Sequence, residues 1–114
     1  MSDFIKKLET LNKEKKDIIG SVRQINTSGV SKTQAQNLRE YARQIESIDE
    51  ILLYLDYQCA RDNKLKPAGE KLVVLIKNYK GKGIDVIRYL LGTFARWVLI
   101  QSKKNGKNDK GEIK

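Results

Sequence analysis

Residue types that commonly carry out catalysis are sparse in this chain of 114 residues. The chain contains no histidine, which excludes an imidazole base, an imidazole metal ligand and a Ser-His relay. The single cysteine, Cys59, excludes an internal disulfide and any site built from several cysteines. Because Cys59 shares an apolar stripe with Leu52 and Leu55, we expect it to be a core residue rather than a nucleophile.

Carboxylates are the remaining groups that could support hydrolysis. Glu46 and Glu50 lie one helical turn apart, and Asp49 is adjacent to Glu50. Solvation and capping of a helix explain these pairs without chemistry. The segment Gly81-Lys82-Gly83 is too short for a phosphate-binding loop, which needs a longer glycine frame after a strand. We therefore expect no enzymatic activity, no cofactor and no metal site.

Basic residues are far more abundant than acidic ones. Lys and Arg number 23 against 14 Asp and Glu, which gives a net charge of +9. Such an excess favours polyanionic partners. Six basic residues are the candidate contacts to nucleic acid, because three follow one side of a predicted helix and three cluster at a predicted joint between helices. They are Lys32, Arg39, Arg43, Arg61, Lys64 and Lys66.

Some of these residues have alternative roles. Arg61 could instead form an ion pair with the neighbouring Asp62. Tyr41 and Tyr57 could stack on bases, although packing with a solvated hydroxyl is the commoner role of tyrosine. The sequence leaves these alternatives open.

Apolar residues recur at helical spacing along most of the chain. The first predicted helix runs from Ser2 toward Gly20, with Phe4, Ile5, Leu8 and Leu11 on one face. Two further helices are predicted to begin at Ser31 and Ser47, where a serine followed three residues later by Gln or Glu forms a capping-box signature. A fourth has Pro67 in its first turn and ends at Gly81-Lys82-Gly83.

The last predicted helix spans about Ile84 to Gln101 and is apolar around much of its circumference. We therefore expect it to lie centrally in the fold. The predicted fold is all-α: a single compact bundle of about five helices formed by residues 1–102, with a disordered basic tail at 103–114. No apolar run approaches the roughly 20 residues that span a bilayer, and no leader is evident. The sequence thus favours a cytoplasmic protein with no membrane partner.

A distinctive order of residues lies in the second half of the chain. Tyr57-Gln58 is followed by Arg61-Asp62, then Leu65-Lys66, then Glu70-Lys71 before an apolar helix. This pattern resembles the small subunit of the type III-A CRISPR effector, the Csm complex. That family has a Tyr-Gln/Glu-Ala-Gly-Arg-Asp/Glu segment followed by Val-Lys and Glu-Lys. Weaker similarity extends from Val30 to Lys104.

The chain departs from this family at several positions. Cys59-Ala60 stands where the family has Ala-Gly, and Gln34 and Gln36 stand where it has basic residues. The resemblance implies an all-helical, non-catalytic subunit that self-associates along a ribonucleoprotein filament. Its implied partners are the guide RNA, the target RNA and the other subunits of the effector, and it would contact RNA backbone without reading sequence in support of antiviral defence.

A second interpretation is a small helical DNA-binding regulator or nucleoid-type protein. In that case a recognition helix should present polar side chains to base edges from its N-terminal end. Gln34, Gln36 and Asn37 occupy such positions. The two interpretations differ in the nucleic acid that is bound.

Overall fold

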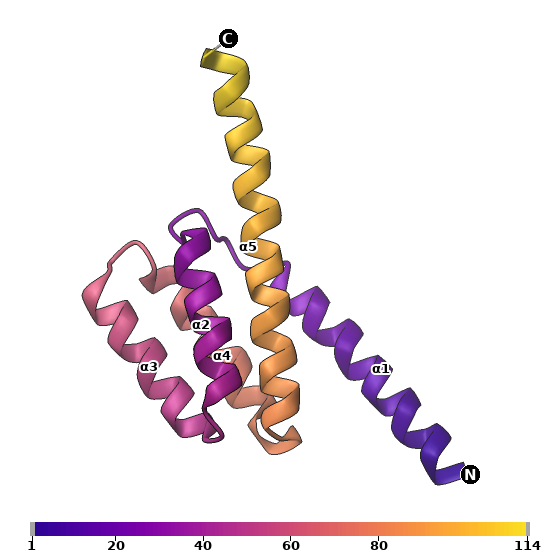
Figure 1. Ribbon diagram of the computed structural model, residues 1–114. Helices are drawn as coiled ribbons and strands as arrows, with labels where there is room; N and C mark the ends of the chain where they lie inside the picture. The colour runs from indigo at the N-terminus through magenta and orange to yellow at the C-terminus, as the bar shows by residue number, and fades with distance from the viewer. Residues whose placement is uncertain (1, 114) are drawn as a thin grey trace.

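The computed structural model describes the backbone of residues 2–113 and the side chains of residues 12–103. Within that range the backbone is helical, without strands, and the predicted all-α bundle is confirmed (Figure 1). The α-helices are α1 (Ser2–Val22), α2 (Lys32–Gln44), α3 (Ile48–Arg61), α4 (Lys66–Tyr79) and α5 (Ile84–Ile113).

Both predicted serine caps are present. Ser31 Oγ accepts a hydrogen bond from the backbone N–H of Gln34, and Gln34 Oε1 accepts one from the N–H of Ser31, each at 3.0 Å. Ser47 Oγ accepts the N–H of Glu50 at 3.3 Å. Because the backbone is extended at Ile45, with φ −103° and ψ 135°, α2 and α3 are separate helices.

Helix α4 begins and ends where the sequence predicts. Pro67 lies in its first turn, where a missing N–H costs no helical hydrogen bond. A 3₁₀ turn, Lys80–Lys82, follows the helix. Gly83 then adopts φ 101°, a conformation that favours glycine, and so the chain reverses into α5.

Helix α5 occupies the centre of the bundle, as predicted, and contacts α1, α2 and α4. Its side chains supply a large part of the core, namely Ile87, Leu90, Leu91, Phe94, Ala95 and Val98. The backbone of α5 continues beyond the bundle to Ile113 (Figure 1). Disorder is predicted for residues 103–114, and apart from Lys103 the side chains of these residues lie outside the described range.

Helix α1 is longer than its predicted end near Gly20. It continues through that glycine because Ile18 and Val22 are both buried against the bundle. Trp97 Nε1 donates a hydrogen bond to the carbonyl of Ile25 at 3.0 Å, which fixes the chain after the helix to α5. The predicted apolar face nearer the N-terminus lies outside the described side chains. The described helices include none that combines the length and apolarity needed to cross a membrane.

Candidate nucleic-acid interface

The six predicted contact residues fall into two groups in the structure. Lys32, Arg39 and Arg43 lie on α2 at spacings that place them along one side of the helix, and we call these residues the α2 flank. Arg61, Lys64 and Lys66 lie where α3 passes into α4, and we call these residues the α3–α4 joint. All are exposed except Arg39, which is partly buried. One group thus belongs to α2 and the other to the connection between α3 and α4.

The charge of the α2 flank is partly compensated. Glu40 Oε1 lies 3.4 Å from Arg39 Nη2 and 3.2 Å from Arg43 Nη1. The aliphatic part of Arg39 runs beside Gly92 of α5, where a Cβ would come within 3.9 Å of Arg39 Cδ. Arg39 Nε is buried and has no hydrogen-bond partner among the described residues. Of this group, Lys32 has the most freely available charge.

The α3–α4 joint carries a different electrostatic arrangement. Among residues 12–103, no acidic side chain forms an ion pair with Arg61, Lys64 or Lys66. The guanidinium of Arg61 instead lies 5.4 Å from the ring centroid of Tyr57, a cation–π arrangement that leaves its charge available. The alternative ion pair with Asp62 does not form. This joint is the stronger candidate for binding phosphate.

Asp62 has a structural role that explains why it does not pair with Arg61. Its Oδ1 accepts the backbone N–H of Lys64 at 2.9 Å, and its Oδ2 accepts Gln34 Nε2 at 2.6 Å. These hydrogen bonds, the one from Gln34 foremost, lower the pKa of Asp62 below its ordinary value. Asp62 thus holds the turn of the joint and ties it to α2.

The loop between α1 and α2 also contacts the joint. Gly29 packs so closely on the backbone of Lys64 that a side chain at position 29 would collide with the Lys64 carbonyl. Val30, the next residue, is buried. The orientation of the joint therefore depends on this loop as well as on α3 and α4.

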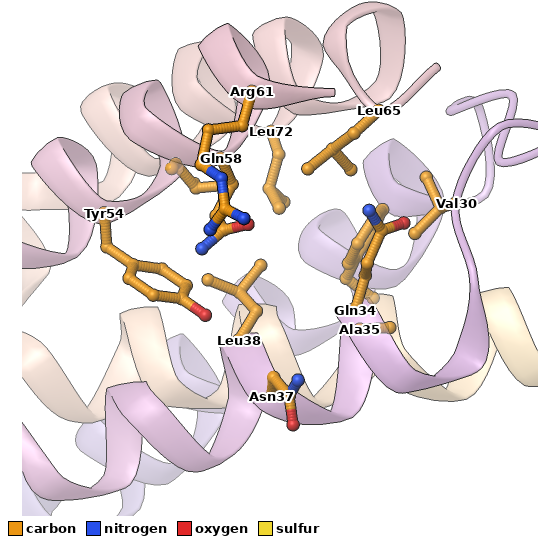
Figure 2. A pocket seen from close by; sticks show the side chains of 12 residues that line it. Val30, Gln34, Ala35, Asn37, Leu38, Tyr54, Gln58, Arg61, Leu65 and Leu72 are labelled. Carbon is orange, nitrogen blue, oxygen red and sulfur yellow. The ribbon is translucent and has the colours of Figure 1, made fainter. Parts of the chain in front are cut away.

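A cavity of about 210 Å³ lies between α2 and α3, next to the joint (Figure 2). Its lining includes buried apolar side chains and more exposed polar ones. The polar lining residues are Gln34, Asn37, Tyr54, Gln58 and Arg61. Sequence reasoning selected Arg61 for its charge but missed Tyr54 and Gln58 as site residues. Tyr54 and Gln58 lie seven and three residues before Arg61, which places them on the same side of α3, and that spacing was the available signal.

The carboxylates considered for catalysis lie on the exposed surface. Glu46, Asp49 and Glu50 are exposed, and Asp49 Oδ1 accepts a hydrogen bond from Lys80 Nζ at 2.6 Å. Within the described residues no three His, Cys, Asp or Glu side chains gather in a way that could hold a metal ion. Cys59 is buried, as predicted, and desolvation together with the charge of Asp56 raises the pKa of its thiol.

The chain matches no family model, no curated protein and no solved structure.

Gln34, Gln36 and Asn37, the candidate base-reading residues of a DNA regulator, differ in how freely their side chains can move. Gln34 is held at both ends of its carboxamide, by Ser31 and by Asp62, and so cannot turn toward a base edge without losing these hydrogen bonds. Gln36 and Asn37 are exposed. Of the three predicted residues, only these two have side chains without a hydrogen-bond partner among residues 12–103.

Proposed function

We propose that this protein binds single-stranded RNA along its phosphate backbone without reading sequence, and that it serves as the non-catalytic small subunit of a type III-A CRISPR ribonucleoprotein. The observation that carries the RNA-binding part is the α3–α4 joint, where Arg61, Lys64 and Lys66 are exposed and have no ion-pair partner among the described residues. Phosphate is the natural counter-charge for such a cluster.

The lysines of the joint are better suited to contacts with the phosphate backbone than to contacts with bases. Lys64 and Lys66 are long, flexible cations on an exposed surface, which suits them to phosphates at varied positions. The α2 flank adds a second basic surface, in which Lys32 is the most freely available cation. Basic residues on both α2 and the joint favour an extended strand over a single compact anion.

The subunit assignment rests on the resemblance of the Tyr57–Lys71 segment. In the folded chain this segment forms the last turns of α3, the joint and the first turn of α4. Asp62 of the resembling motif organises the turn while the adjacent Arg61 stays available. The adjacent Arg and Asp of the motif thus have different roles in the proposed RNA-binding joint: Asp62 stabilises the turn, and Arg61 binds phosphate.

We propose that the partners are guide RNA, target RNA and other effector subunits, with copies of this chain repeated along a filament. Each copy would contribute few contacts, and adjacent copies would multiply affinity through raised effective concentration. An isolated copy should then bind short RNA with a Kd on the order of micromolar. RNA cleavage would belong to partner subunits.

A direct test compares binding to single-stranded RNA, RNA duplex and DNA duplex of one sequence at a fixed salt concentration. The proposal expects the single strand to bind best, with similar affinity for unrelated sequences. Strong preference for one DNA sequence would favour the regulator instead. Metal-dependent RNA cleavage by the purified protein that disappears when Glu46 or Glu50 is substituted would contradict the non-catalytic role.

A further inference from the structure

The cavity between α2 and α3 combines an apolar floor with a polar rim. Its floor includes Leu38, Leu55, Leu72 and Phe94, all of them buried. Its rim is formed by the polar side chains, of which Arg61 and Asn37 are exposed and Tyr54 and Gln58 are half-buried. A site with this distribution suits a flat ligand that has an apolar face and a polar edge.

Three polar groups converge on the cavity without partners in the described part of the chain. Figure 2 shows the side chains of Arg61, Gln58 and Tyr54 extending from α3 toward Leu38 of α2, with the Tyr54 hydroxyl pointing toward Leu38. Within residues 12–103 none of these three groups hydrogen-bonds to another side chain or to the backbone, in contrast to Gln34, which is bound to Asp62. Their hydrogen-bonding capacity is therefore available to a ligand.

The part of the cavity rim that Tyr54 forms is held in place by aromatic packing. The ring of Tyr54 is stacked on that of Tyr41, with centroids 4.1 Å apart and planes inclined by 13°. Because this contact fixes the orientation of the Tyr54 ring, this part of the rim does not have to be ordered when a ligand enters. A cavity of about 210 Å³ also suits a ligand the size of one aromatic base, since an engineered apolar cavity of about 150 Å³ is known to admit benzene.

We infer that this cavity receives one unstacked nucleobase of the bound RNA strand, with Arg61 at its mouth contacting the adjoining phosphate. The inference rests on the proposed function, because it assigns a base site beside the phosphate-binding joint. The apolar floor contacts the face of the base, while Gln58 and Tyr54 hydrogen-bond to its polar edge. Both side chains can donate and accept, and so the site tolerates different bases.

The experiment compares an octauridylate with an octamer of abasic ribose phosphate, which carries the same backbone charge. Affinity of the full-length protein for each is measured by fluorescence anisotropy at two salt concentrations. We expect the octauridylate to bind about fivefold or more tightly. Raising the salt should weaken both oligomers while leaving the ratio of their affinities nearly unchanged, because base burial does not release counterions.

Substitutions distinguish the cavity from stacking on the outer surface. Gln58→Phe, which fills the cavity without changing charge, should remove the preference for octauridylate and leave affinity for the abasic octamer within about twofold. Tyr54→Phe keeps the stack on Tyr41 and removes only the hydroxyl, and so it should reduce the preference even if Gln58→Phe does not fold. Tyr57→Ala removes the exposed ring, and Gln44→Phe adds a ring at the far end of α2. Both control variants should retain the preference.

The possible outcomes separate this inference from the proposed function. Equal affinity of the unmodified protein for the two octamers would overturn the base site and leave backbone binding intact. Loss of the preference in Tyr57→Ala but not in the two cavity variants would move the base to the outer surface and overturn the inference. Failure of the protein to bind either octamer would overturn both proposals.

Discussion

Gln34 and Asp62 are joined by a 2.6 Å hydrogen bond between the Gln34 Nε2 and the Asp62 Oδ2. The other end of the Gln34 carboxamide accepts the N–H of Ser31, which fixes the orientation of the amide and directs its N–H₂ toward Asp62. One side chain thus completes the cap of α2 and attaches α2 to the α3–α4 joint. The position of Arg61 and its neighbours depends on this attachment.

Acid should destabilise the protein partly through Asp62. Its pKa in the folded state is lowered from the ordinary value of 3.8, and so its stabilising effect is present above that value and is lost as pH falls through the folded-state pKa. We expect the free energy of unfolding of Asp62→Asn to fall less steeply between pH 4 and pH 2 than that of the unmodified protein. Urea unfolding at several pH values measures this difference. Asp56→Asn, which alters an exposed carboxylate on α3, is the control.

Substitution of Arg61 by Gln should weaken RNA binding to a similar extent for unrelated sequences. If Arg61 neutralises one phosphate, the slope of log K against log salt should become shallower by about 0.7 for a single strand. Lys77→Gln removes an equal charge from an exposed position in the last turn of α4, away from the joint, and should change the slope little. Loss of affinity for only one sequence would instead assign Arg61 to base readout.

Removal of the Phe94 ring should strongly destabilise the fold. Phe94 is 1% exposed and belongs to the central stripe of α5. Phe94→Ala is therefore expected to reduce the free energy of unfolding by about 3–5 kcal/mol. Chemical denaturation followed by circular dichroism provides the measurement. A variant as stable as the parent would show that the ring does not pack as described.

Because α3 and α4 pack closely at Cys59 and Gly69, we expect substitutions at these two positions to have non-additive effects on the free energy of unfolding. A Cβ at Gly69 would collide with Sγ of the buried Cys59, and so Gly69→Ala should cost about 1–3 kcal/mol. In a Cys59→Ala background the sulfur is absent, and Gly69→Ala should cost at least 1 kcal/mol less. A double-mutant cycle of unfolding free energies tests this coupling. Additive effects of the two substitutions would argue against the close approach.

Much of the fold could be predicted because helix signals are local. The caps at Ser31 and Ser47 involve partners three residues away, and Pro67 and Gly83 act at their own positions in the backbone. Apolar spacing likewise identified the stripe of α5 before any neighbour was known. The end of α1 was predicted too early because burial of Ile18 and Val22 outweighs the low helix propensity of Gly20.

The candidate site could be predicted only in part. Charge and spacing selected the two basic clusters, since both depend on residues close together in the sequence. Sequence alone did not decide whether Arg61 pairs with Asp62, because the answer depends on Gln34, which lies 28 residues away and occupies that carboxylate. The cavity could not be predicted from the sequence either, since its lining comes from helices whose side chains meet only after packing. Short-range hydrogen bonding and composition specify the helices, the starts of α2 and α3 and the excess of positive charge, and these features could therefore be predicted. Which charges remain unpaired, and where a cavity opens, depend on contacts between residues that are distant in the chain and meet only in the folded protein.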